Sequence, residues 1–169
     1  MNKKFSKHIG ALIAIAGCLA PILSGCQPHE GSEKQLLETV DSFATNYYNW
    51  HFEKALKYCT PESERWLRFA ASNVHSADID LLHAKQEDAT VSIEDVDYHD
   101  DEVSASVNLQ VDNFLQMDTI GKAAHPIKTG TFVLQMKIHD GRWKVDLYKE
   151  GLPKLRMANL QQNESGSHD

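Results

Sequence analysis

The nine residues VSASVNLQV, from Val103 to Val111, alternate apolar and polar side chains without a break. Successive side chains of a β-strand point to opposite faces, so this pattern predicts a strand with one buried side and one solvent-facing side. A second alternation runs from Phe132 to Ile138 and is followed by Asp140-Gly141, a pair that favours a tight hairpin turn. Residues 143–147 also alternate apolar and polar side chains, which predicts a strand antiparallel to the one before the turn.

A weaker strand signal precedes these strands. Val91 and Ile93 alternate with polar residues and predict a strand that ends near Tyr98, followed by a polar turn at His99-Asp100-Asp101. Downstream of Val111, glycine and proline interrupt the alternation, and residues 114–130 are therefore expected to form a long connection.

The predicted helices precede the predicted strands in the chain. Ser32 and Gln35 fit a capping box, with Ser32 as the N-cap and Gln35 reaching back to it. The helix that follows is predicted to run to about Asn49 on an apolar face formed by Leu36, Val40, Phe43, Ala44 and Tyr47. A short helix is expected from Glu53 to Cys59, and Thr60-Pro61 is typical of the start of a third.

Helices followed by antiparallel strands predict an α+β fold, with N-terminal helices packed on a curved antiparallel sheet. One domain over residues 32–150 accommodates all these elements. Residues 151–169 form a C-terminal extension, expected to be partly disordered because its last seven residues are polar. A small helix over residues 152–160 is a further expectation.

The N-terminus has the pattern of an export signal. Three lysines and no acidic residue fall within the first seven positions, and Ile9–Leu23 is a 15-residue stretch without Asp, Glu, Lys or Arg. This length suits the apolar region of a signal peptide and is short of the roughly 20 residues that span a bilayer. Small residues and Cys26 follow at once.

The residues Leu23, Ser24, Gly25 and Cys26 resemble the lipobox of bacterial lipoproteins. The resemblance implies that residues 1–25 are removed, that Cys26 carries a diacylglycerol on its sulfur and an acyl chain on its amine, and that residues 26–31 form a short tether. It also implies a lipid-anchored protein of the cell envelope. The outer membrane is favoured where the cell has one, because Gln27 rather than aspartate follows the cysteine.

A cysteine is chemically suited to lipid attachment at this position. A thiolate is the best nucleophile for thioether formation, and several acyl chains on one residue give durable membrane attachment. The alternatives are an ordinary secretory signal cleaved nearby or a short transmembrane anchor. Cys18 is a poorer lipidation site, because the residues before it match the lipobox less well.

The charge balance narrows the classes of partner. The chain of 169 residues has 17 basic and 24 acidic side chains, a net charge of −7. Cleavage before Cys26 leaves 144 residues with 14 basic side chains against 24 acidic ones, a net charge of −10. Such an acidic surface argues against binding nucleic acid or anionic headgroups, so the lipid on Cys26 is the expected membrane contact. Cys59 then has no cysteine partner and is expected to be a buried small hydrophobe rather than a nucleophile or an intermolecular bridge.

The hairpin Asp140-Gly141-Arg142-Trp143-Lys144-Val145 and the helical stretch Leu36 to Cys59 resemble the nuclear-transport-factor-two-like, or cystatin-like cone, superfamily. Small exported lipoproteins of unknown function, once labelled lumazine-binding-like, are similar in layout. The resemblance implies a cone with a pocket between the sheet and the long helix. Another helix-on-sheet α+β domain is the rival fold. Because the superfamily includes isomerases, dehydratases and non-catalytic binding domains, the fold alone does not decide the function.

An isomerase-type site needs a carboxylate on the apolar side of the sheet. The clearest strands have no acidic residue on their apolar faces. Only Asp95 and Asp97 share parity with Val91 and Ile93, close to a turn where a bulge can change the register. No catalytic residue, cofactor or metal site is therefore assigned, and the histidines lack metal-type pairing.

Aromatic residues offer a better indication of a site. A pocket mouth for a small apolar ligand is predicted from Tyr47, Tyr48, Trp50, Trp66 and Phe69. The alternative is that these side chains are ordinary core and rim. The function expected is that of a lipoprotein whose soluble domain is a non-enzymatic ligand-binding or assembly module. An isomerase- or dehydratase-like enzyme using the same pocket is the alternative.

Overall fold

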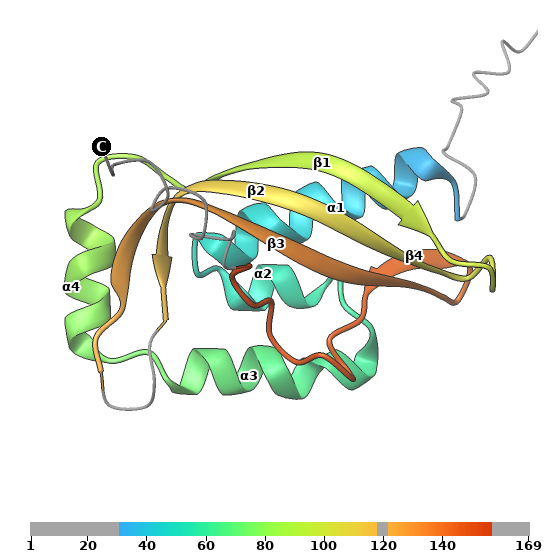
Figure 1. The fold of residues 1–169 in the computed structure, drawn as a ribbon. Helices are drawn as coiled ribbons and strands as arrows, with labels where there is room; N and C mark the ends of the chain where they lie inside the picture. Colours follow the sequence, from blue (N-terminus) through green and yellow to red (C-terminus); the bar gives the residue numbers. More distant parts are fainter. Residues whose placement is uncertain (1–30, 118–121, 157–169) are drawn as a thin grey trace, which may run out of the picture.

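The computed structural model describes residues 31–117 and 122–156 (Figure 1). Its elements, in chain order, are α1 (Glu33–Tyr48), α2 (Phe52–Leu56), the 3-10 helix η1 (Pro61–Ser63), α3 (Glu64–Ser72), α4 (Ser76–Ala84), β1 (Thr90–Tyr98), β2 (Ser104–Gln116), β3 (His125–His139) and β4 (Arg142–Val145). The strands form one antiparallel sheet in the order β1-β2-β3-β4. The predicted α+β class, with helices first and a curved antiparallel sheet after them, is confirmed.

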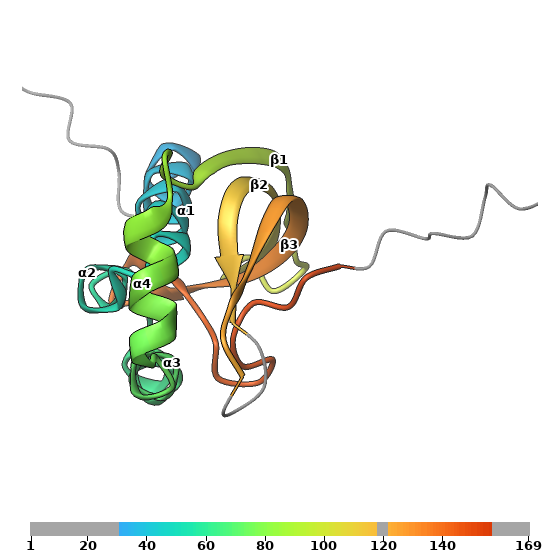
Figure 2. The same cartoon turned by 90° about the vertical axis from the view of Figure 1, so that its left-hand side faces the viewer.

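The helices and the sheet form two layers (Figure 2), and buried side chains from both layers make up the core. The apolar side chains that the alternation places on the inner face of β2 are fully buried: Ala105, Val107, Leu109 and Val111. Val103 is 44% exposed and precedes the strand. The opposite side of the core comes from α1, whose predicted apolar face is buried at Leu36, Val40, Phe43 and Ala44.

The hairpin of β2 and β3 is longer than predicted. Pairing continues from Val111↔Gly130 to Gln116↔His125, so the expectation of a connection over residues 114–130 is wrong for most of its length. Asn113 has a φ of 54°, a left-handed conformation that asparagine tolerates better than most residues. Phe114 and Leu115 after it are both buried, so the period of two is lost although the strand continues.

A bulge in β1 places its acidic residues. Ile93 pairs with Leu109 and Asp95 pairs with Asn108, so Glu94 is the additional residue. The bulge reverses the parity beyond it, and Asp95 and Asp97 lie on the exposed side. The expectation that these two carboxylates share a face with Val91 and Ile93 is therefore wrong.

The start of α1 confirms half of the predicted capping box. The Ser32 hydroxyl accepts a hydrogen bond from the Gln35 amide nitrogen at 3.2 Å. The Gln35 side chain does not return to Ser32 and instead bonds to the backbone of Trp143 in β4. This residue therefore joins the first helix to the last strand.

Beyond β4 the chain returns beside β3 without forming a helix. The backbone nitrogen of Arg156 donates to the carbonyl of Thr131 at 2.9 Å, and the two residues form an isolated antiparallel bridge. The expectation of a helix is wrong for residues 152–156.

The lipobox residues Leu23, Ser24, Gly25 and Cys26, together with Cys18, lie outside the described residues. So do residues 157–169, most of the predicted C-terminal extension. Among the described helices, none is long and apolar enough to cross a membrane.

Candidate functional site

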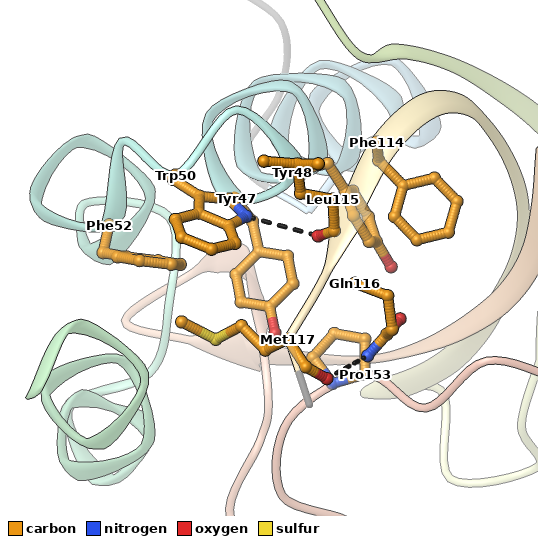
Figure 3. A pocket seen from close by; sticks show the side chains of 9 residues that line it. All are labelled: Tyr47, Tyr48, Trp50, Phe52, Phe114, Leu115, Gln116, Met117 and Pro153. Atoms are coloured by element: carbon orange, nitrogen blue, oxygen red, sulfur yellow. Dashed lines mark hydrogen bonds between the residues drawn. The ribbon is translucent and has the colours of Figure 1, made fainter. Parts of the chain in front are cut away.

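Aromatic side chains gather where α1 ends. Tyr47 contacts Tyr48 edge to face with 5.0 Å between ring centroids, and it meets Phe52 of α2 at 5.7 Å. Trp50 has a φ of 60°, which turns the chain after the helix and stacks its ring on Phe52. Its indole nitrogen donates to the carbonyl of Leu115 at 3.4 Å, so the cluster is attached to the end of β2 (Figure 3).

This cluster encloses a narrow cavity of about 20 Å³. Its walls are Tyr47, Tyr48, Trp50, Phe52, Phe114, Leu115, Gln116, Met117 and Pro153 (Figure 3). A volume of this size holds about one water molecule. The aromatic rings therefore pack closely and leave only a small space at the end of the helix.

A wider cavity of about 160 Å³ shares four walls with the narrow one: Tyr47, Gln116, Met117 and Pro153. Its other walls are Phe69, Ala70, Asn73, Asp78, Lys122, Ala124 and Leu152. An apolar cavity of about 150 Å³ is large enough for a benzene molecule. We call the two together the composite cavity, which has a narrow aromatic end and a wider end with polar groups.

The Tyr48 hydroxyl has an unusual environment. Tyr48 is 4% exposed, and among the described residues its buried hydroxyl has no hydrogen-bond partner. The ring is held by Phe132 at 4.8 Å and Phe114 at 5.6 Å. Burial raises the pKa of Tyr48 well above its ordinary value, and the neighbouring Tyr47 raises it further. Tyr48 is thus a neutral donor with no acceptor in the described part of the chain, a state that costs about 1–3 kcal/mol.

Asp78 is the carboxylate of the wider end, and it is 3% exposed. Its Oδ1 accepts from the backbone nitrogen of Ala124 at 2.7 Å and its Oδ2 from that of His75 at 2.8 Å. The Ala124 bond is the main reason that the pKa of Asp78 is lowered, the His75 bond and ring lower it further, and desolvation opposes them. A carboxylate held in this way is a weak base.

The structure unites four of the five aromatic residues predicted to line a pocket. Tyr47, Tyr48 and Trp50 surround the narrow end, while Phe69 is 46% exposed and borders the wider end. Trp66 is not a wall of either cavity. Its ring lies against Gly151, and the guanidinium of Arg65 is 5.2 Å from the ring centroid.

Sequence reasoning missed several walls because they come from distant segments. Gln116 and Met117 fall in the stretch expected to be a connection, and Pro153 in the expected C-terminal helix. The spacing of Asp78 from His75 is a local signal for its position at the start of a helix. At the start of α4, the Asp78 carboxylate accepts from the backbone nitrogen of His75 three residues earlier, which is the contact that the third helical residue makes in a capping box.

Other reactive groups do not add to this site. Burial raises the pKa of the Cys59 thiol to about 12, with a smaller opposing effect of Lys144 and a contribution from Asp146. Cys59 is therefore the buried small hydrophobe that the sequence predicted. Within residues 31–117 and 122–156, no three His, Cys, Asp or Glu side chains are grouped closely enough to hold a metal ion.

Comparisons with protein-family models, with curated proteins and with solved structures found no match for this chain.

Proposed function

We propose that this protein is an exported lipoprotein, anchored through lipid on Cys26, whose α+β domain binds a small and mainly apolar molecule in the composite cavity. The observation that carries the binding proposal is the Tyr48 hydroxyl. A buried donor with no partner among the described residues is costly, and Tyr48 borders the narrow end of the cavity and not the wider one. A ligand whose ring lies in the wider end and whose acceptor oxygen enters the narrow end would satisfy this hydroxyl.

The cavity walls support a ligand of limited size. Aromatic rings and Met117 offer apolar contact, and the wider end has room for about one six-membered ring. Because burial raises the pKa of both Tyr47 and Tyr48, both hydroxyls stay protonated as donors over the physiological pH range. A ring compound with a carbonyl or hydroxyl oxygen matches these walls.

An isomerase- or dehydratase-like enzyme is the second candidate, because one carboxylate, Asp78, does border the composite cavity. Its two backbone hydrogen bonds and lowered pKa favour a structural role over that of a general base. The Asp78→Asn variant distinguishes the two functions. Ligand binding persists in this variant if the protein is a binding module, whereas turnover of a ring ketone is lost if Asp78 is the base.

Binding is tested by thermal unfolding of the full chain in detergent with a panel of monocyclic phenols, ketones and lactones. Ala70 is fully buried and borders the wider cavity, whereas Ala71 is exposed beside it on α3. Ala70→Met fills the cavity and should abolish any ligand-induced rise in Tm. Ala71→Met is the matched control and should retain it. A panel that shifts neither the parent nor Ala71→Met, while a protein partner or a dimer is recovered, favours the assembly role instead.

Anchoring is tested separately with Cys26→Ser. This variant should leave the membrane fraction and lose incorporation of labelled fatty acid. If the parent chain itself incorporates no fatty acid and the Cys26→Ser protein stays with the membranes, the lipoprotein proposal is wrong.

A further inference from the structure

The first described residue, Gly31, is held against the last hairpin of the sheet. Nε1 of Trp143 on β4 donates to the carbonyl oxygen of Gly31 at 2.8 Å. Gly31 has a φ of 73°, and a Cβ built on it would lie 3.3 Å from Cδ1 of Ile138 on β3. The point at which the N-terminal segment joins the domain is therefore fixed beside the β3–β4 turn.

Two exposed apolar side chains lie beside this point. Tyr98 is 47% exposed, and its ring centroid is 6.0 Å from that of Trp143. Desolvation raises the pKa of Tyr98, and the carboxylate of Glu33 at the start of α1 raises it further, so the two side chains are close. Val103 is 44% exposed, and its carbonyl accepts from the backbone nitrogen of Ile138 at 2.8 Å. We call Tyr98, Val103 and the half-buried Ile138 the tether-end surface.

The tether-end surface and α4 lie at opposite ends of the domain. Figure 1 shows the start of α1 at the same end as the β1–β2 and β3–β4 turns, with α4 at the other end. The 16 residues of α1 give it a length of about 24 Å. Gly31 is five positions after Cys26, and five residues span at most about 18 Å when fully extended. A lipid on Cys26 would therefore keep this surface, and not α4, within one tether length of the bilayer.

We propose that the tether-end surface docks on a phospholipid bilayer and so orients the domain on the membrane. The inference rests on the proposed function, because the lipid on Cys26 brings the surface to the bilayer. Tyrosine is favoured at membrane interfaces, where its ring meets the acyl chains and its hydroxyl stays in the wet headgroup layer. Val103 adds apolar area whose removal from water is favourable. These side chains orient a domain that the acyl chains retain.

The charges around the surface favour neutral headgroups. Three consecutive acidic residues, Asp100, Asp101 and Glu102, form the β1–β2 turn, and the exposed Lys137 and Arg142 offset only part of this charge. Anionic headgroups would repel the turn, so the docking contact is apolar. The composite cavity, at the other end of α1, then lies away from the bilayer, and its ligand would enter from the aqueous phase.

The experiment uses the full lipidated chain in phosphatidylcholine vesicles, with an environment-sensitive fluorophore on one introduced cysteine and brominated lipid as the quencher. Once residues 1–25 are removed and Cys26 is lipidated, only the introduced cysteine reacts, because Cys59 is buried and its pKa is raised to about 12. Val103→Cys reports on the tether-end surface. Ile79→Cys on α4 is the matched control, since both variants replace an exposed aliphatic side chain. The label on Val103→Cys should show a blue-shifted emission that brominated lipid quenches, whereas the label on Ile79→Cys should emit as in water and escape quenching.

A second set of variants separates the contact of the protein from insertion of the label itself. Tyr98→Ser should reduce the quenching of the label on Val103→Cys. Tyr148→Ser should not, because Tyr148 is similarly exposed but lies against Arg65 of α3. Lys34→Cys at the start of α1 and His83→Cys on α4 are a second pair at exposed helix positions, which serves if Val103→Cys does not fold.

The chemical state of Cys26, measured by mass spectrometry on the same samples, distinguishes the two proposals. Equal quenching at the two ends of a chain that carries fatty acid on Cys26 would overturn the docking proposal and leave the lipoprotein proposal intact. Quenching that is unchanged by Tyr98→Ser would also overturn docking, since the label alone would then account for it. A chain without fatty acid on Cys26 would overturn both proposals.

Discussion

The side-chain amide of Gln35 hydrogen-bonds both backbone groups of Trp143. Its Oε1 accepts from the Trp143 nitrogen at 2.7 Å and its Nε2 lies 3.3 Å from the Trp143 carbonyl oxygen. Further along β4, the carbonyl of Val145 accepts from Thr60 and its nitrogen donates to Tyr58. The Gln35 side chain therefore takes the place of a residue in a neighbouring strand. Together with the contacts of Val145, it covers the outer edge of β4, which would otherwise be open to association with another strand.

Replacing Gln35 by alanine should lower the free energy of unfolding by about 1–3 kcal/mol, because two backbone groups of Trp143 lose their partner. Urea denaturation followed by tryptophan fluorescence measures this change. Lys34→Ala is the matched control, since Lys34 is exposed and its ion pair with Glu38 lies on the surface. Equal stability of the Gln35→Ala and Lys34→Ala proteins would contradict the role given to Gln35.

Single residues with irregular backbone explain where prediction of the strands from the sequence failed. Uninterrupted alternation identified β2 correctly as far as Val111, and one left-handed residue, Asn113, concealed the rest of the strand. In β1 the extra residue Glu94 reversed the parity on which the placement of acidic residues depended. Local patterns describe an element only while its backbone stays regular.

In the candidate site, too, the sequence predicted the grouping of neighbouring residues but not the contacts between distant segments. Tyr47, Tyr48 and Trp50 are close in the sequence, and their grouping was predicted. Pro153 reaches the cavity only because the chain returns beside β3, and no local spacing encodes such a contact. Gln35 was expected to face its own helix end, yet a carbonyl and an amide 108 positions away were better placed partners.

Replacing Tyr48 by phenylalanine should make the ligand-free protein more stable. The buried hydroxyl has no partner in the described part of the chain, so its removal should raise the free energy of unfolding by about 1 kcal/mol while the ring keeps its contacts with Phe114 and Phe132. Tyr98→Phe, at a 47% exposed site, should change little. A ligand that raises the parent's Tm should bind Tyr48→Phe more weakly. A clear loss of stability would instead mean that the hydroxyl is satisfied, and the binding proposal would lose its basis.

Asp78 should make the free energy of unfolding depend on pH in the acid range. Because its folded pKa lies below the ordinary 3.8, the unfolded chain binds this proton more readily than the folded one. The contribution of Asp78 is therefore complete above pH 3.8 and is lost as the pH falls below that value toward the folded pKa. Asp78→Asn should flatten the fall of the urea midpoint over this acid range, and the exposed Asp80→Asn should not. Identical acid profiles for the two variants would show that the hydrogen bonds from His75 and Ala124 do not carry the effect.

A side chain at Gly130 should be destabilising, because it would crowd Leu155 and the Phe114 ring. A Cβ at Gly130 would overlap the Leu155 side chain and would lie 3.0 and 3.2 Å from two atoms of the Phe114 ring. Gly130→Ala should therefore cost about 1–3 kcal/mol, the usual range for overpacking, and displace the segment that bonds Arg156 to Thr131. Urea denaturation measures the cost, and faster trypsin cleavage after Lys154 reports the displacement. Leu155→Ala vacates the space, so the double variant should lose less stability than the sum of the single losses. Strict additivity would mean that Leu155 already moves freely away from Gly130, and that β3 does not hold the returning chain in the way described.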